Sequence, residues 1–185
     1  EWFRTKYNEI FSRLRLIVVN EITMRNMMFR WLNGLLALVA LFMTVINIFT
    51  AEYVLMTVTF VFSLVCVLNI ILCLRTGSIK TWLMVLFEVE TLALIAFFFI
   101  SGIPNGFSAQ WICLIPSFAL LIFGTKKGTI FSATAFAMEI FFFWTPLGRS
   151  VLMYEYTKEF MLRFPFVYVA FYIICLLYTS PSPRD

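Results

Sequence analysis

Three glutamates lie inside long apolar stretches of the sequence, and they have the clearest capacity for chemistry. Glu88 and Glu90 share one stretch, and Glu139 lies in another. Measured from the nearest lysine at about 1.5 Å per helical residue, they lie roughly 12 to 18 Å along their helices. That depth is near the midplane of a hydrocarbon core about 30 Å thick. No Lys or Arg shares these stretches, so desolvation favours the neutral acids.

Two interpretations of these acids stay open. The first is an intramembrane centre that handles protons or cations, formed from the candidate residues Glu88, Glu90, Glu139 and Asn69, with Asn47 and Gln110 as further polar groups. The second is structural, because protonated carboxyls can hydrogen-bond neighbouring helices. Glu88 and Glu90 are separated by about 200° around a helix, so at most one of them readily meets Glu139.

The residue types exclude several kinds of site. The sequence has no His, which removes haem–His ligation, a His–Cys zinc site and a Ser–His triad. Its four cysteines lie in apolar runs without CxxC spacing, so buried inert thiols are expected. Residues 124–128 lack the spacing of a phosphate-binding loop. We therefore expect no catalytic residue, no metal site and no cofactor in this chain.

The composition predicts a membrane protein. Of 185 residues, 62% are hydrophobic and 13% are charged, against about 45–50% and about 25% in soluble domains. We expect an all-α polytopic fold with the lipid bilayer as its solvent. An amphipathic basic helix in residues 1–26 lies along the headgroups or packs as a linker helix. In the membrane domain, 27–174, the six expected spans are 31–49, 53–74, 81–100, 107–123, 129–146 and a truncated 164–174.

Two further features refine these spans. Pro116 is expected to kink or break the fourth one. The basic residues set the orientation, because ten lie on the side of the N-terminus and three on the opposite side. The positive-inside rule then places both ends of the chain in the cytoplasm. The net charge of +4 is spread over the ends of the spans, which indicates topology determinants, and no nucleic-acid partner is expected.

The opposite side holds the residues that an external stimulus would meet. They are Glu52, Asn105, Gln110, Trp111, Tyr154 and Tyr156. The last two belong to the one long connection, about 147–163, which is expected to form a short interfacial helix. That connection either covers a pocket for a small ligand or is a simple tether.

The two ends of the sequence suggest a fragment. It begins at Glu1, and residues 175–185 resemble a translated reading frame of a transposase adapter used in sequencing libraries. The apolar run before them, 164–174, is about 16 Å of helix, too short for a span of about 20 residues. We therefore expect the native sequence to stop near Ile174, 175–185 to be non-native, and the parent protein to continue.

Five short motifs in the second half of the chain carry a family resemblance. They are Gly-Ile-Pro-Asn-Gly at 102–106 leading to Trp111, Leu-Leu-Ile-Phe-Gly at 120–124 with Lys126 and Lys127, Phe-Phe-Trp-Thr-Pro-Leu-Gly at 142–148, Tyr-Glu-Tyr-Thr at 154–157 and Arg-Phe-Pro at 163–165. With these motifs the chain resembles the multi-span N-terminal module found ahead of bacterial GGDEF diguanylate cyclase domains and related signalling outputs.

The resemblance implies a sensory and anchoring module in a bacterial inner membrane. Its last span would lead into a cytoplasmic diguanylate cyclase domain, through which the protein would form a homodimer. No GGDEF residues occur in this sequence, so no catalytic position is carried over. The alternative is a fragment of a proton- or cation-coupled transporter or channel, in which the three glutamates form the coupling site.

Overall fold

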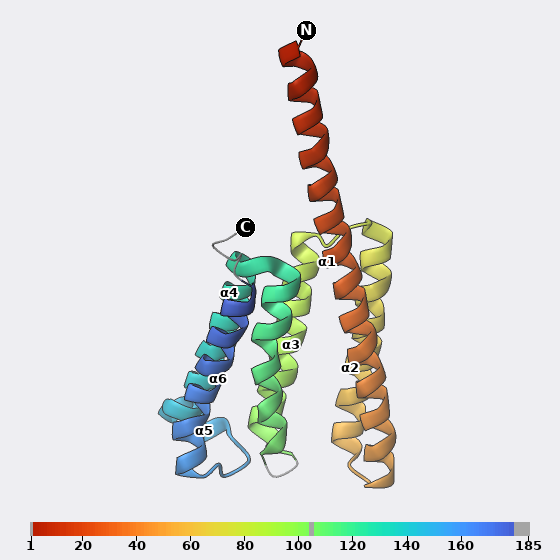
Figure 1. Cartoon of the computed structure of the whole chain (residues 1–185). Helices are drawn as coiled ribbons and strands as arrows, with labels where there is room; N and C mark the ends of the chain where they lie inside the picture. The colour runs from red at the N-terminus through yellow and green to blue at the C-terminus, as the bar shows by residue number, and fades with distance from the viewer. Residues whose placement is uncertain (1, 104–105, 180–185) are drawn as a thin grey trace. The chain divides into compact units, whose positions relative to one another are not determined.

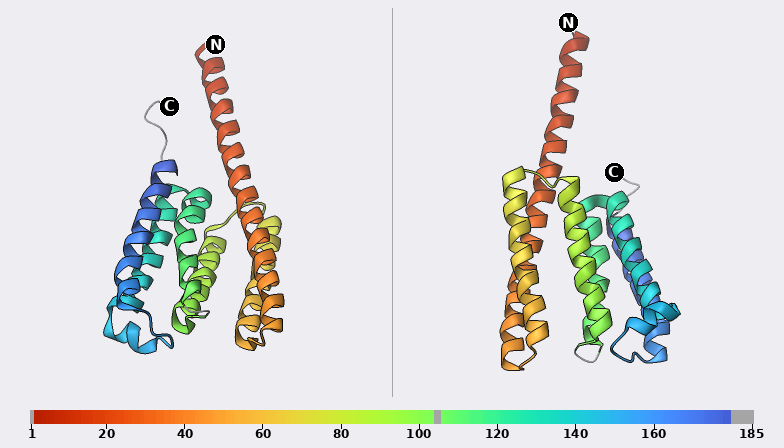
Figure 2. Two further views of the ribbon diagram at one scale, coloured as in Figure 1. Left: turned by 60° about the horizontal axis from the view of Figure 1, so that its bottom comes forward. Right: turned by 180° about the vertical axis from the view of Figure 1, so that it is seen from behind.

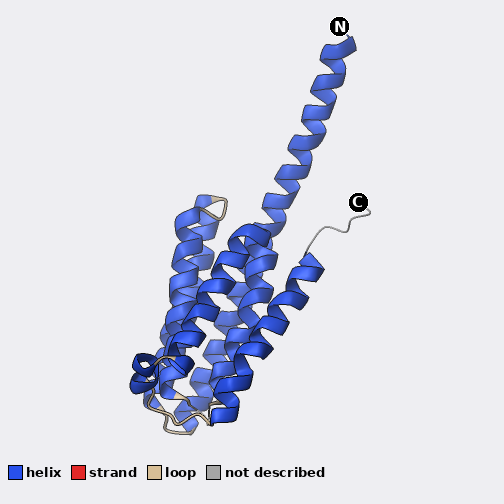
Figure 3. Ribbon diagram, turned by 90° about the vertical axis from the view of Figure 1, so that its left-hand side faces the viewer, coloured by secondary structure: helices blue, strands red, loops and turns tan. Residues whose placement is uncertain are grey.

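The computed structural model describes residues 2–103 and 106–179, with side chains from residue 22 onward. Within these ranges all regular structure is helical and no strand occurs (Figure 3). Five helical segments are long and apolar enough to cross a membrane: Ile22–Phe49, Tyr53–Thr76, Thr81–Ser101, Phe107–Trp144 and Lys158–Thr179. The expected all-α membrane fold is therefore confirmed.

The chain divides into two compact units, Glu1–Leu83 and Met84–Asp185. The first unit is a hairpin of α1 (Trp2–Phe49) and α2 (Tyr53–Thr76), which lie side by side (Figure 1). A three-residue turn joins them, and α2 ends at Gly77, whose φ of 67° is the left-handed value that glycine adopts most easily.

Small and polar side chains form the contact between α1 and α2. Its buried residues are Asn26, Phe29, Asn33, Ala37, Ala40, Thr44 and Asn47 on α1, and Thr59, Ser63, Cys66, Asn69 and Cys73 on α2. They recur at every third or fourth position, which places them on one face of each helix. Large apolar side chains such as Leu38 and Phe42 point away from the contact and are exposed, as expected of helices that face lipid.

Hydrogen bonds cross this contact at three levels. Because lipid is as apolar as leucine, such bonds and close packing hold helices together in a membrane. The three are Thr44 Oγ1 to Thr59 Oγ1 at 2.9 Å, Ser63 Oγ to the Ala37 carbonyl at 3.1 Å, and Asn69 Nδ2 to Asn33 Oδ1 at 3.2 Å.

The second unit contains most of α3 (Thr81–Ser101), the 3₁₀ helix η1 (Phe107–Leu114), α4 (Ile115–Trp144), α5 (Pro146–Val151) and α6 (Lys158–Thr179). Within α4, Gly124 leaves the helical conformation with φ 77° and ψ 172°. A Cβ on Gly128 would lie 2.5 Å from the carbonyl oxygen of Ala119. The chain therefore folds back on itself at Gly124, and both views of Figure 2 show this reversal.

Aromatic rings fill the interior of the second unit. Phe87 of α3 contacts Phe123 and Phe131 of α4, with ring centroids 6.0 and 6.4 Å apart. Further along α3, Phe99 meets Phe143 edge to face at 5.1 Å. Such pairs contribute about 0.5–1.5 kcal/mol beyond their buried area, and they tie α3 to both arms of α4.

Prolines define where three helices begin or lose a bond. Pro116 lies in the first turn of α4, where the chain changes from the 3₁₀ helix η1 to an α-helix while Leu114 and Ile115 keep right-handed helical backbone angles. Pro146 opens α5, and Thr145 before it accepts a hydrogen bond from Gly148 N at 2.9 Å. Thr followed by Pro is a favourable helix start because it satisfies one free N–H and removes another. The short helix expected in the long connection is α5.

Pro165 lies inside α6 and has no N–H for the Met161 carbonyl, its usual helical partner. The indole Nε1–H of Trp144 donates to that carbonyl instead, at 3.1 Å. A side chain from the end of α4 therefore replaces a missing backbone bond in α6.

Several boundaries differ from the sequence prediction. α1 is continuous from Trp2, so the expected amphipathic helix and the first span are one helix. The side chains of residues 1–21 lie outside the described part, and the amphipathic character stays a prediction. α6 begins at Lys158, directly after Thr157, whose Oγ1 accepts from Phe160 N at 3.2 Å. It extends to Thr179 because residues 175–178 continue its apolar run. Whether residues 175–185 are non-native stays a prediction, and 180–185 lie outside the described residues.

Candidate functional site

Glu139 is the most isolated ionisable group in the described part of the second unit. It lies on the second arm of α4 with an exposed fraction of 0%. Neither carboxyl oxygen has a hydrogen-bond partner among the described residues. A buried polar group without a partner has a cost of about 1–3 kcal/mol. Such a group calls for an explanation beyond packing.

Two side chains from other elements lie close enough to Glu139 to interact with its charge. They are Cys113 of η1 and Tyr168 of α6. The Tyr168 hydroxyl donates to the Ser132 carbonyl at 2.8 Å, and its ring stacks on Phe136 with centroids 5.7 Å apart. The Glu139 side chain is fully buried, on a helix that packs against both α6 and η1.

The other residues of the predicted polar centre lie on other helices. Glu88 and Glu90 are half-buried on α3. Asn69 belongs to the first unit, where it is buried and donates to Asn33. Asn47 is also buried in that unit, on α1. Asn69 and Asn47 therefore belong to one unit, and Glu88, Glu90 and Glu139 belong to the other.

Tyr168, Cys113 and Ser132 are the residues around Glu139 that sequence reasoning missed as parts of a site. The sequence could have indicated Tyr168, because a hydroxyl in the middle of an apolar helix needs a hydrogen-bond partner when it is buried. It could not have indicated Cys113, because nothing in its spacing distinguishes it from the other cysteines. In the described ranges, no three His, Cys, Asp or Glu residues gather to hold a metal ion.

A second candidate site is the tyrosine loop, residues 152–157, between α5 and α6. Its backbone joins the end of α3 through Met153 N, which donates to the Ile100 carbonyl at 2.8 Å. The Tyr156 hydroxyl donates to the Phe99 carbonyl at 3.0 Å. Both acceptors are carbonyls of the last turn of α3, where helical partners run out. The tyrosine loop therefore caps α3.

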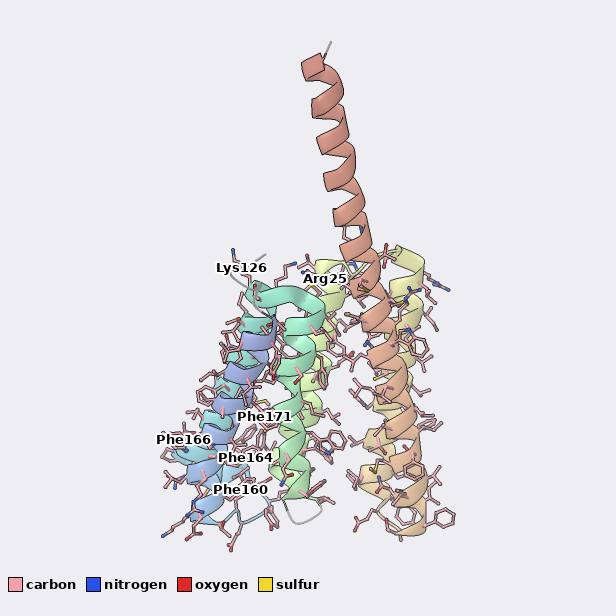
Figure 4. The ribbon with its side chains drawn as sticks, viewed as in Figure 1. Arg25, Lys126, Phe160, Phe164, Phe166 and Phe171 are labelled. Carbon is pink, nitrogen blue, oxygen red and sulfur yellow. The ribbon has the colours of Figure 1, made fainter. Side chains whose placement is uncertain are left out.

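Two tyrosines seal this end of the second unit. Tyr154 packs directly on Gly102, whose φ is 59°, and no Cβ fits there. Tyr156 is buried, and its ring stacks on Phe160 with centroids 5.4 Å apart. Burial, together with the nearby Tyr154, raises the pKa of Tyr156 to about 12. The pair packs against Gly102 and Gly106. Phe160, on which Tyr156 stacks, lies at the end of the unit away from Lys126 (Figure 4).

The remaining residues of the predicted stimulus site belong to other elements. Gln110 is exposed and Trp111 is half-buried, both on η1. Glu52 is exposed in the turn between α1 and α2, which belongs to the first unit. Asn105 lies outside the described residues. Of the six candidates, Tyr154 and Tyr156 are in mutual contact, with ring centroids 4.9 Å apart.

Long apolar helices are features of a membrane-embedded domain. Comparison with protein families supports this class, because the model of the MASE6 family matches residues 20–182. The chain belongs to the MASE6 family of membrane-associated sensory domains. No curated protein and no solved structure matches the chain.

Proposed function

We propose that this chain is the sensory and anchoring module of a bacterial diguanylate cyclase, in which α6 leads into a cytoplasmic GGDEF domain. Membership of a membrane-associated sensory family over residues 20–182 carries the proposal. The motifs at 102–106, 142–148 and 154–157, which resemble modules ahead of GGDEF domains, support this particular output. Dimerisation of the output domain would make the whole protein a homodimer.

The proposed topology has six spans in the bacterial inner membrane, with both ends in the cytoplasm. α4 supplies two of them, because its arms run back from Gly124 and the Gly128 backbone lies against Ala119. An even number of spans places both ends on one side. The ten basic residues on that side against three on the other support a cytoplasmic location.

The tyrosine loop supports a route by which a stimulus would act. Tyr156 holds the last turn of α3 through the Phe99 carbonyl, and α6 begins two residues later at Lys158. A small ligand that binds one arrangement of the 102–106 turn more tightly would shift the population of that arrangement. A change in the bilayer that favours one arrangement would have the same effect. Because α6 starts at this loop, its position would change with the turn.

Reading the parent gene past codon 174 tests the output. A GGDEF domain in frame supports the proposal, and further hydrophobic spans contradict it. The activity test then uses the parent protein in bacterial membranes, with cyclic di-GMP as the readout. Tyr156→Phe should change the basal output, whereas Tyr53→Phe, an exposed tyrosine of the first unit, should leave it unchanged. Equal output from both variants would refute the route through the tyrosine loop.

One observation favours the second candidate, a fragment of a proton- or cation-coupled transporter. Glu139 is fully buried and its carboxyl has no partner among the described residues, as expected of a group that releases and rebinds a proton. Glu139→Gln keeps the shape and removes the titration. Loss of proton uptake in vesicles, with the folded state retained, would support transport. Unchanged uptake would leave Glu139 a structural role.

A further inference from the structure

The charges of the first unit are separated between its two ends. From residue 22 to residue 83 the sequence has four basic residues, Arg25, Arg30, Arg75 and Lys80, and a single acidic one, Glu52. The four basic residues flank the end of the hairpin that contains Gly77, and Glu52 occupies the turn at the other end. Glu21 precedes Arg25 by four residues in the sequence, so this end of the first unit has one acidic residue beside four basic ones and keeps a net positive charge.

Asn26 fixes the basic end by joining both segments that carry the charges. Its Nδ2 donates to the Gly77 carbonyl at 3.1 Å, and its Oδ1 accepts from Ile79 N at 3.0 Å. A single α1 side chain thus holds the turn after α2 against α1. As a result, Arg75 and Lys80 lie at the level of the α1 arginines, one of which, Arg25, is labelled in Figure 4.

A groove of about 370 Å³ lies beside the Asn26 hydrogen bonds. It is lined by Met27, Arg30 and Trp31 of α1 and Leu74 of α2. Arg30 Nε donates to the Asn26 carbonyl at 3.2 Å, which positions the guanidinium at the groove. Its other N–H donors can still bind an anion. Trp31 is 74% exposed, and tryptophan prefers the level where lipid headgroups meet the acyl chains.

We propose that this groove binds an anionic phospholipid. The phosphate would lie on Arg30, whose planar guanidinium matches two phosphate oxygens, and Arg75 and Lys80 would add attraction. The acyl chain would lie along Met27, Leu74 and Trp31. The apolar lining distinguishes a lipid from free phosphate, because a small inorganic anion gains nothing from three apolar side chains.

The test uses the full chain in bilayers of phosphatidylcholine mixed with phosphatidylglycerol. Native mass spectrometry counts the lipids that remain bound after extraction. Wild type should retain phosphatidylglycerol preferentially, and Arg30→Gln should lower that preference about fivefold, the effect of one basic residue near a membrane surface. Arg149→Gln is the matched control, since Arg149 is an exposed arginine of the second unit.

Three outcomes would overturn the proposal: equal retention by the Arg30 and Arg149 variants, no preference in wild type, or release of the lipid by inorganic phosphate at matched ionic strength. A second readout does not depend on how well the Arg30 variant folds. Phosphatidylglycerol with brominated acyl chains should quench wild-type tryptophan fluorescence more than brominated phosphatidylcholine does. Trp31→Phe should remove this difference, and its persistence would also refute the groove as the site.

Discussion

The two units are built from similarly apolar helices but are held together in different ways. In the first unit, α1 and α2 meet along small and polar residues linked by side-chain hydrogen bonds. In the second, aromatic rings and close approaches at Gly128 and Gly102 hold the helices. Lipid supplies no hydrophobic drive between helices. One chain thus holds its helices together in lipid in two ways. The first unit uses several weak side-chain hydrogen bonds, and the second uses close packing.

The sharpest way to break this contrast is to add a methyl group to one helical glycine of each unit. Gly128→Ala should lower the free energy of unfolding by about 3 kcal/mol, because its Cβ would overlap the Ala119 backbone, which cannot move aside. Gly34→Ala meets only Ile70, at 4.0 Å. It should be neutral or stabilising by up to about 1 kcal/mol. Denaturation in detergent micelles measures both, and equal losses would contradict the contrast.

A second pair compares glycines with left-handed backbones. Gly77 and Gly102 have φ of 67° and 59°, so alanine at either costs about 1 kcal/mol of strain. At Gly77 nothing lies within 4 Å, whereas at Gly102 the Cβ also overlaps Tyr154. Because the nearest atom is the Tyr154 Cβ, which rotation of that side chain does not move, the loop backbone must shift, and Gly102→Ala should cost about 3 kcal/mol in total. If Gly77→Ala costs as much in the same unfolding assay, the tyrosine loop does not pack as described.

The pH dependence of stability tests Tyr156. Its pKa is raised to about 12, mainly by burial, so the neutral form is favoured in the folded state. The stability that this provides is complete below the unfolded-state pKa of about 10, and it is lost as the pH rises through 12. Tyr156→Phe should remove this alkaline loss and cost about 1 kcal/mol at neutral pH by deleting the bond to Phe99.

Unfolding midpoints measured between pH 9 and 12 would fall less steeply with pH in this variant than in wild type. Tyr53→Phe, in the exposed turn region of the first unit, is the control, and its unfolding midpoint should fall with pH as in wild type. If the midpoint of the Tyr156 variant also falls as in wild type, another group causes the loss of stability.

The smallest effect concerns the polar links of the first unit. A double-mutant cycle of Thr44→Val and Thr59→Val should give a coupling energy of about 0.6 kcal/mol, the average for such bonds in membranes. Thr44→Val combined with Thr134→Val, an exposed position of the second unit, should be additive. A coupling near zero in the first cycle would leave shape alone as the basis of both units.

Helical class and the approximate number of spans could be predicted from the sequence, because apolar length alone decides them. The depth of Glu139 in the bilayer stays a prediction. Which of the three glutamates is fully buried could not be predicted, since an all-apolar helix does not show which face meets protein and which meets lipid. Tyr168 and Cys113 reach Glu139 only through the packing of α4, α6 and η1. The polar face of α1 was not predicted, although Asn26, Asn33, Thr44 and Asn47 share a helical period that could have shown it.

The replaced backbone bond at Pro165 has a consequence for how α6 is oriented. The Met161 carbonyl is held by the indole of Trp144 and not by its own helix. The first turns of α6 therefore take their direction from the end of α4. A shift of the end of α4 by a fraction of an ångström would move Trp144. Through its hydrogen bond to the Met161 carbonyl, it would also move the first turns of α6.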